Sequence, residues 1–261
     1  MKFFQLVLVS LSFLCYVYSK EFKTANYSRM VGGQAVDISD LPYAASILHL
    51  GEHICGGVIV SRYFVLTAAS CFKNVQSEEQ IQVRVGSFRA YYSGIIIDAD
   101  FYILYPDYGT DFASTEHDVA LVRLAYPLKF DNNIQLAAVA DLGEEPVAGS
   151  LAVVIGWERF EVTRDIAGDL RQINVTIVDG FDCFVAYMDI QDITKNHLCA
   201  GSFKKYTAAC RGDIGSPLIV DGLIVGLFSR TSNCSDPNQP AIYTNLAKYF
   251  TWIEYSIKLF T

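Results

Sequence analysis

Positive charge is scarce in this sequence. Its 261 residues include 20 lysines and arginines against 28 aspartates and glutamates, for a formal net charge of −8. An acidic surface repels phosphate backbones, which argues against nucleic-acid binding and against a heparin-type site. Metal-ligating patterns are lacking as well, since no two cysteines form a C-x-x-C pair and the four histidines are scattered. We expect neither a metal nor another cofactor.

Long apolar runs are confined to the N-terminus. No later segment has about 18 uninterrupted apolar residues, the length needed to cross a bilayer. Lys2 precedes an apolar run from Phe3 to about Val17, and Val17 and Ser19 place small residues at the −3 and −1 positions of a cleavage site. This pattern is typical of a secretory signal peptide over residues 1–19, with an uncleaved anchor as the alternative. We expect a secreted, extracellular protein that makes no membrane contact.

The composition is that of a folded protein. Hydrophobic residues make up 52% and charged residues 18%, which excludes a disordered chain. The length allows one large domain or two fused lobes. Removal of the signal peptide leaves an even number of cysteines, which in a secreted chain indicates disulfides, but six cysteines allow 15 pairings and spacing cannot choose among them. These are Cys55, Cys71, Cys183, Cys199, Cys210 and Cys234.

Short apolar runs separated by turn residues dominate the chain and predict an all-β sandwich or barrel. They cover residues 44–50, 58–69, 80–86, 118–124, 151–157, 173–178, 223–228 and 241–246. A turn-rich stretch at 141–150 could join two β lobes. One helix is expected at the C-terminus, where apolar residues recur at steps of three and four. These residues are Leu246, Phe250, Ile253, Ile257 and Phe260.

Four separated motifs carry a resemblance to a known family. Residues 29–33 (RMVGG) are similar to an activation site, and residues 67–71 (TAASC) to a segment that normally holds a catalytic histidine. Residues 117–121 (HDVAL) resemble a segment with a catalytic aspartate, and residues 212–217 (GDIGSP) one with a catalytic serine. Each motif is weak alone. Together, in this order, they resemble the trypsin-like serine proteases of the chymotrypsin fold.

The resemblance implies a fold of two six-stranded antiparallel β-barrels followed by a C-terminal α-helix. The trypsin-like domain would cover 30–261, with barrels at about 30–145 and 146–245 and the helix at about 246–260. The resemblance also implies three disulfides. The implied pairs are Cys55–Cys71, Cys183–Cys199 and Cys210–Cys234.

Activation of the family follows cleavage of a pro-segment, which here would be residues 20–29 cut after Arg29. The freed amine of Met30 would then pair with Asp213, and both partners are present. His53 matches a histidine that is common in the family for structural reasons, and we interpret it as a packing or hydrogen-bonding residue.

The triad positions of the family are altered. Acyl transfer of this type needs a hydroxyl nucleophile, an imidazole base and an aspartate that orients the imidazole. Asp118 remains, but the base position holds Ser70 and the nucleophile position holds Ile214. His117 should point to the opposite face from Asp118 and should not replace the imidazole. Backbone N–H groups at Gly212 and Ile214 could still form an oxyanion hole. We therefore expect a pseudoprotease.

The positions that line the specificity pocket of the family have changed too. Ala208 falls at the base of the pocket, where a trypsin has aspartate. Ser229, Arg230 and Thr231 replace a Ser-Trp-Gly segment, and Ala241 replaces a pocket glycine. These larger side chains predict a partly filled substrate channel. The alternative for Arg230 is a surface position, paired with an acid.

Two asparagines are candidates for N-glycosylation, because each begins an N-x-[ST] sequence. Asn174 is the better candidate, since Asn233 adjoins the cysteine of an implied disulfide. An unmodified polar surface residue is the alternative.

The leading hypothesis is a secreted, catalytically inactive serine protease homologue that acts as a protein-binding antagonist and is monomeric. The sequence further resembles the inactivated protease paralogues of the scabies mite and the mite group 3 allergens. That resemblance implies binding to extracellular host proteins, and inhibition of complement above all. Alternatives are a weakly active or displaced-chemistry serine endopeptidase, a non-catalytic cofactor of a protease cascade, and a decoy for protease inhibitors.

Overall fold

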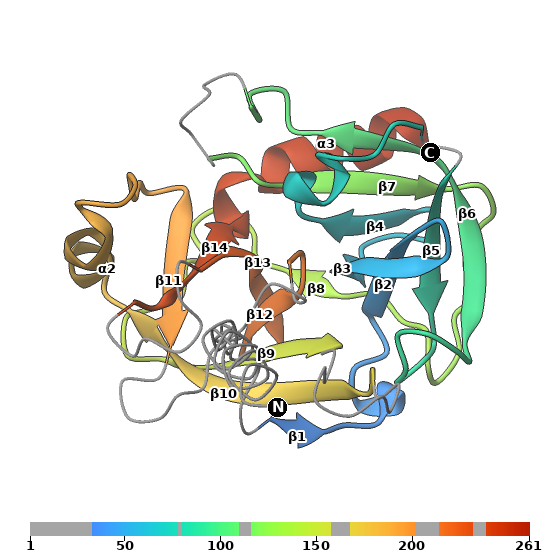
Figure 1. The fold of residues 1–261 in the computed structure, drawn as a ribbon, viewed down its shortest axis with the longest axis horizontal. Coiled ribbons are helices and arrows are strands. Elements are labelled where there is room, and N and C mark those ends of the chain that lie inside the picture. The colour runs from blue at the N-terminus through green and yellow to red at the C-terminus, as the bar shows by residue number, and fades with distance from the viewer. Residues whose placement is uncertain (1–32, 78–79, 110–115, 158–167, 202–213, 232–238) are drawn as a thin grey trace, which may run out of the picture.

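The computed structural model describes residues 33–77, 80–109, 116–157, 168–201, 214–231 and 239–261. These residues form two β-barrels that lie side by side (Figure 1). The first barrel closes in the order β2-β3-β4-β7-β6-β5. Its strands are β2 (Ala44–His49), β3 (Glu52–Ile59), β4 (Phe64–Thr67), β5 (Ile81–Val85), β6 (Ile95–Leu104) and β7 (Ala120–Leu124).

The second barrel is closed by the pairing of β9 with β10, and its other neighbours follow the order β10-β11-β14-β13-β12-β9. Its strands are β9 (Leu151–Trp157), β10 (Leu170–Val178), β11 (His197–Gly201), β12 (Pro217–Val220), β13 (Leu223–Arg230) and β14 (Ala241–Asn245). The predicted fold of two six-stranded antiparallel barrels is confirmed.

Two short strands extend the second sheet from parts of the chain that the sequence placed with the first barrel. β1 (Gln34–Ala35) pairs with β10, and β8 (Ala138–Val139) pairs in parallel with β13. Both segments therefore cross onto the second barrel. They pair with residues of β10 and β13 that lie before the stretches paired with β11 and β14, where backbone groups are free to bond. Each barrel is in this way bound to chain from the other half of the sequence.

The helices differ in part from expectation. The C-terminal helix α3 (Phe250–Phe260) is present, and a short 3-10 helix, Leu246–Lys248, precedes it in place of its first predicted turn. A second helix, α2 (Gly180–Tyr187), was not predicted. The carboxylate of Asp179 caps it by accepting the N–H of Phe181 at 2.8 Å.

The apolar run over 58–69 contains parts of two strands, because the chain reverses between β3 and β4. The hydroxyl of Ser61 accepts the backbone N–H groups of Tyr63 and Phe64 at 3.1 and 3.0 Å. Such side-chain bonds favour a turn over a continuous strand. The residues of β3 and β4 that flank this turn are apolar and buried, so the sequence shows one apolar run across it.

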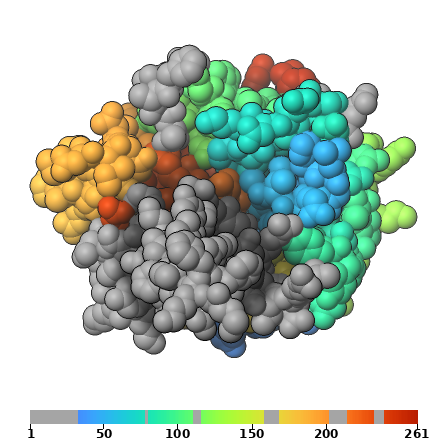
Figure 2. Space-filling view, viewed as in Figure 1, coloured from blue at the N-terminus to red at the C-terminus, as the bar shows by residue number. Residues whose placement is uncertain are grey.

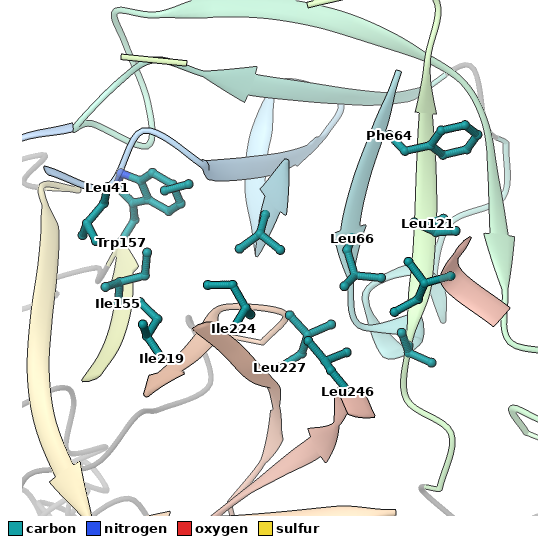
Figure 3. Packing of buried hydrophobic residues seen from close by; sticks show 14 of the residues in the cluster. Leu41, Phe64, Leu66, Leu121, Ile155, Trp157, Ile219, Ile224, Leu227 and Leu246 are labelled. Carbon is teal, nitrogen blue, oxygen red and sulfur yellow. The ribbon is translucent and has the colours of Figure 1, made fainter. Parts of the chain in front are cut away.

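A buried apolar cluster lies between the two barrels (Figure 3). Phe64, Leu66 and Leu121 enter it from the first barrel. Trp157 and Leu227 are among those that enter it from the second. Each barrel has an apolar interior of its own as well. The shared cluster fixes one barrel against the other, and the groups at their junction are thereby held in place.

The C-terminal helix returns to the first barrel. Arg123 on β7 donates its Nε–H to the carbonyl oxygen of Phe260 at 3.0 Å, and the ring of Phe101 on β6 meets the Phe260 ring edge to face. Nowhere in the described ranges is a helix long and apolar enough to cross a membrane.

Candidate functional site

The three triad positions, of which those held by Ser70 and Ile214 are altered, lie on three different segments at the junction of the barrels. Ser70 belongs to the 3-10 helix Ala69–Phe72 that follows β4. Asp118 precedes β7, and Ile214 precedes β12. A buried carboxylate without its usual imidazole donor is costly, so Ser70, Ser229 or a water is expected to bind Asp118. The structure joins Asp118 to both Ser70 and Ser229 by hydrogen bonds.

The carboxylate of Asp118 is buried, at 3% exposure, and accepts three hydrogen bonds. Ser70 donates its backbone N–H to Oδ1 at 2.7 Å and its hydroxyl to Oδ2 at 2.9 Å. Ser229 donates its hydroxyl to Oδ2 at 2.6 Å. Two serine hydroxyls thus bind the group that would orient an imidazole in an active member of the resembled family.

A β-bulge brings Ser229 to this position. Phe228 pairs with Tyr243 and Arg230 pairs with Ile242, so Ser229 is an extra residue in β13 opposite β14. An inserted residue of this kind turns its side chain out of the regular alternation of a strand. The sequence named Ser229 as a pocket residue, but only the bulge explains how its hydroxyl reaches Asp118.

Burial raises the pKa of the Asp118 carboxyl, because an ionised carboxylate loses its hydration there. The hydrogen bonds from Ser229 and Ser70 and the positive charge of Arg230 oppose that rise. The same environment acts on Tyr108, whose pKa burial and the negative charge of Asp118 raise to about 12. The site is therefore poorly hydrated, and burial favours the neutral forms of Asp118 and Tyr108.

The guanidinium group of Arg230 donates hydrogen bonds to two side chains, those of Gln191 and Ser229. Its Nε–H donates to Oε1 of Gln191 at 2.7 Å, and its Nη1 donates to the hydroxyl of Ser229 at 3.2 Å. The Ser229 hydroxyl accepts from Arg230 while it donates to Asp118, so the cation acts on the carboxylate through one hydroxyl. Arg230 is half-buried in this network.

His197 is a site residue that the sequence did not reveal. Its Nε2 lies 3.4 Å from Nη2 of Arg230, and its Nδ1 accepts the backbone N–H of Thr194 at 3.1 Å. An N–H donor lies beside each ring nitrogen, and these two donors oppose a second proton on the ring. Burial first, and then Arg230, lower the pKa of His197 to about 4. No local motif surrounds this histidine, and only strand pairing brings it to Arg230.

Ile214 occupies the nucleophile position with an apolar side chain. It packs against the interior clusters of both barrels. Its carbonyl oxygen accepts the N–H of Gly56 at 2.8 Å, and the next residue, Gly215, donates its N–H to Phe228 at 2.8 Å. Gly215 has a φ of +79°, and a Cβ there would lie 2.3 Å from Oγ1 of Thr67. The turn is therefore held tightly against both barrels, with no nucleophilic atom at position 214.

His117 and His53 make their contacts away from the Asp118 carboxylate. His117 has a φ of +60°, and its Nδ1 lies 3.0 Å from the hydroxyl of Tyr249 while its ring stacks on Tyr105. It points toward the C-terminal helix, away from the carboxylate, as expected, although it lies outside a strand. His53 bonds to the hydroxyl of Ser46 at 2.7 Å, which fits its predicted structural role.

The remaining predicted residues fall into two groups. Ala241 is buried on β14, Thr231 is half-buried after β13, and Asn174 is exposed on β10. The disulfides Cys55–Cys71 and Cys183–Cys199 are present. The other predicted residues and segments lie outside the described residues. These are the segments 1–19 and 20–29 and the residues Arg29, Met30, Ala208, Cys210, Gly212, Asp213, Asn233 and Cys234.

The chemistry available at this site follows from its atoms. Asp118 is bonded to the hydroxyls of Ser70 and Ser229, and Arg230 donates to the Ser229 hydroxyl. Position 214 has only a hydrocarbon side chain. The imidazole of His197 meets Arg230 and not the carboxylate. Among the residues that the structure describes, no group of three or more His, Cys, Asp or Glu side chains could hold a metal ion.

Comparison with known proteins gives one consistent match. Residues 30–253 match the family model described as trypsin. A vitellin-degrading protease of Bombyx mori is 31% identical over 229 residues, 88% of this chain and 86% of that protein. The kallikrein 1-related peptidase b26 of Mus musculus is 33% identical over 240 residues, 87% of this chain and 89% of that protein. The solved structure of neuropsin, a serine protease of mouse brain, has a TM-score of 0.77 and 29% identity, covering 87% of this chain and 99% of its own.

Proposed function

The chain belongs to the trypsin family of serine proteases, and we propose that it is a member without proteolytic activity that is secreted and acts by binding other proteins. One observation carries the proposal. The carboxylate of Asp118 is bound by the hydroxyls of Ser70 and Ser229, and the nucleophile position is filled by Ile214. The relatives named above are called proteases or peptidases, so the proposal sets this chain apart from them.

The proposed inactivity rests on the chemistry of acyl transfer. The reaction needs an attacking atom and a base that removes its proton, and isoleucine supplies no such atom. Ser70 places a hydroxyl at the base position, and for it to attack a substrate Asp118 would have to act as its base. Even with its pKa raised by burial, a carboxylate is a poor base for an alcohol of far higher pKa.

Substrate access supports the same proposal. Arg230 stands where the resembled family has a flat aromatic side chain, and Gln191 and Ser229 hold it there by hydrogen bonds. A peptide backbone that entered along β13 would meet this side chain and would have to displace it. The site is therefore suited neither to the reaction nor to its usual substrate.

Protein binding is proposed because the scaffold is retained while the reacting groups are not. The N-terminal apolar run supports secretion, and the disulfides suit an oxidising compartment. We propose extracellular host proteins as the partners, with complement components as the first candidates. The choice of complement rests on the resemblance to the inactivated mite paralogues. We propose a monomer that needs no cofactor.

Two measurements test these proposals separately. Purified protein is screened against a peptide library and activated esters, with Ser70→Ala as a control, and no turnover is expected from either. Dose-dependent inhibition is expected when the protein is added to a serum complement assay. An absence of inhibition at micromolar protein would remove the complement role, and capture from host plasma followed by mass spectrometry would identify other partners.

A displaced-chemistry endopeptidase is the second candidate, favoured by the 2.9 Å contact between the Ser70 hydroxyl and Asp118. Turnover in the screen that Ser70→Ala abolishes would establish it and end the proposal of an inactive protein. A cascade cofactor would instead accelerate a partner protease without turnover of its own.

A further inference from the structure

Helix α2 presents an apolar surface to solvent. Cys183 and Tyr187, four residues apart, are buried against the second barrel. The opposite side carries large apolar residues at high exposure, with Phe181 at 71% and Met188 at 60%. Figures 1 and 2 place this helix at the outer edge of the second barrel. We call residues 179–192 the α2 surface, whose exposed apolar members are Phe181, Phe184, Val185, Met188 and Ile190.

The α2 surface is also acidic. Aspartates stand at 179, 182, 189 and 192, all four are exposed, and no lysine or arginine occurs between residues 179 and 194. The described contacts give Asp182, Asp189 and Asp192 no ion pair, in contrast to Asp100, which pairs with Arg123. Apolar groups framed by unpaired negative charge favour a partner that combines apolar and basic side chains.

A cavity of about 460 Å³ adjoins the same helix. Cys183 and Phe184 line it from α2, and Asn245 lines it from the end of β14. Its charged lining residues are Glu145, Asp179 and Lys195, so carboxylates outnumber ammonium groups. Asn245 is 1% exposed, and its Nδ2 donates to the carbonyl oxygen of Lys195, whereas its Oδ1 accepts no hydrogen bond. A buried acceptor without a donor is costly, so the cavity is suited to a ligand that brings an N–H group.

We propose that the α2 surface and this cavity bind an amphipathic helical segment of another protein, with apolar side chains on one face and basic side chains beside them. Its apolar side chains would lie on Phe181, Val185 and Met188, and its basic side chains would face the aspartates. One lysine or arginine would enter the cavity past Asp179 and donate an N–H to Oδ1 of Asn245. The inference rests on the proposed function of protein binding and specifies the surface and the partner chemistry.

A labelled helical peptide of leucine and lysine, with the leucines on one face, is the probe for this surface. Fluorescence anisotropy should show binding to the secreted protein, about tenfold or more tighter than that of a leucine and glutamate peptide. Replacing the lysines by Nε-trimethyllysine keeps the charge but removes the donors. It should weaken binding about fivefold if the contact with Asn245 forms. Equal affinity of the lysine and glutamate peptides would overturn the proposal.

Substitutions on the α2 surface locate the binding. Val185→Ser with Met188→Ser, and separately Asp189→Lys with Asp192→Lys, should each weaken peptide binding about tenfold. All four side chains are exposed, so the thermal unfolding midpoint should stay unchanged. If both double variants bind the lysine peptide as tightly as the unaltered protein, the assignment to α2 is wrong.

Matched controls lie on the other exposed helix, α3. Tyr255→Ser and Glu254→Lys make the same kinds of change at exposed positions, and peptide binding should be retained. The serum assay separates this inference from the proposed function. Inhibition by the unaltered protein that persists in the α2 variants would refute the surface and leave the function standing. Specific peptide binding without inhibition would refute the complement role and leave the surface standing.

Discussion

The hydroxyl of Ser229 donates to the carboxylate of Asp118 over 2.6 Å, from an extra residue in β13 of the second barrel to a segment that leads into β7 of the first. Ser70 holds the same carboxylate from within the first barrel's half of the chain. The remnant of the triad is therefore a hydrogen-bonded link between the barrels. Its groups contribute to stability where the resembled family uses them for catalysis.

Replacing Ser229 by alanine should destabilise the fold. The change removes a buried hydrogen bond to the Asp118 carboxylate and the acceptor that the Ser229 hydroxyl offers to Nη1 of Arg230, for a loss of about 1–3 kcal/mol in the free energy of unfolding. Urea unfolding measures the loss. The control is Ser39→Ala, which removes an exposed hydroxyl bond to Asp37 and should cost less than about 0.5 kcal/mol. Equal effects of the two changes would contradict a structural role for the buried bond.

The variant Asp118→Asn should gain stability over the unaltered protein as pH rises. Because burial raises the pKa of Asp118, the folded state binds its proton more tightly than the unfolded chain does. Ionisation therefore removes stability as pH rises above about 4, at about 1.4 kcal/mol per pH unit until the raised pKa is passed. The amide carries no charge and escapes this loss.

The measurement is urea unfolding of both proteins from pH 4 to 7. The difference in unfolding free energy, variant minus unaltered protein, is expected to increase across this range. A difference that decreases would mean that the bonds from Ser70 and Ser229 outweigh the cost of burial and lower the pKa.

His197 should make the fold sensitive to acid. With its pKa lowered to about 4, the neutral imidazole stabilises the fold at neutral pH. That contribution, up to about 3 kcal/mol, is lost as pH falls from about 6.5 to about 4. Arg230 and His117 favour the neutral ring, while Glu116 favours the charged one. In His197→Gln the unfolding free energy should fall less steeply over this interval.

A direct check is the NMR titration of the His197 ring. Its midpoint should lie near 4 in the unaltered protein and move upward in Arg230→Gln, because the neighbouring positive charge is removed. A midpoint near 6.5 in both proteins would show that neither burial nor Arg230 acts on the imidazole.

Restoring the missing groups should restore part of the reaction. In Ser70→His with Ile214→Ser, Asp118 is already in place to accept from an imidazole, and Ser229 still holds its second oxygen. Hydrolysis of a p-nitrophenyl ester should rise about a hundredfold or more above that of Ser70→His with Ile214→Ala. Adding Arg230→Gly should increase peptide hydrolysis further, since the cleft then opens. No gain in either variant would show that the scaffold no longer supports the geometry.

Part of the site was predictable from the chain because short motifs fix local geometry. The segments around Ser70, Asp118 and Ile214 identify the three triad positions. The residue type at each position then shows which reacting group is kept and which is missing. The reach of Arg230 could not be predicted. Its partners Gln191 and His197 lie 39 and 33 residues away in sequence, and either a surface or a cleft position suited an arginine before the fold was known.

The sequence by itself indicated an all-β chain with a C-terminal helix, since composition and periodicity are properties of neighbouring residues. The resemblance of its motifs to a known family implied the two barrels and identified the replaced base and nucleophile positions. Only the tertiary structure decided that Ser229 reaches Asp118, that His197 faces a cation, and that α2 turns apolar side chains outward. These facts depend on a one-residue bulge and on which strands lie side by side. A one-residue change of register reverses the face on which a side chain lies, and no local pattern records it.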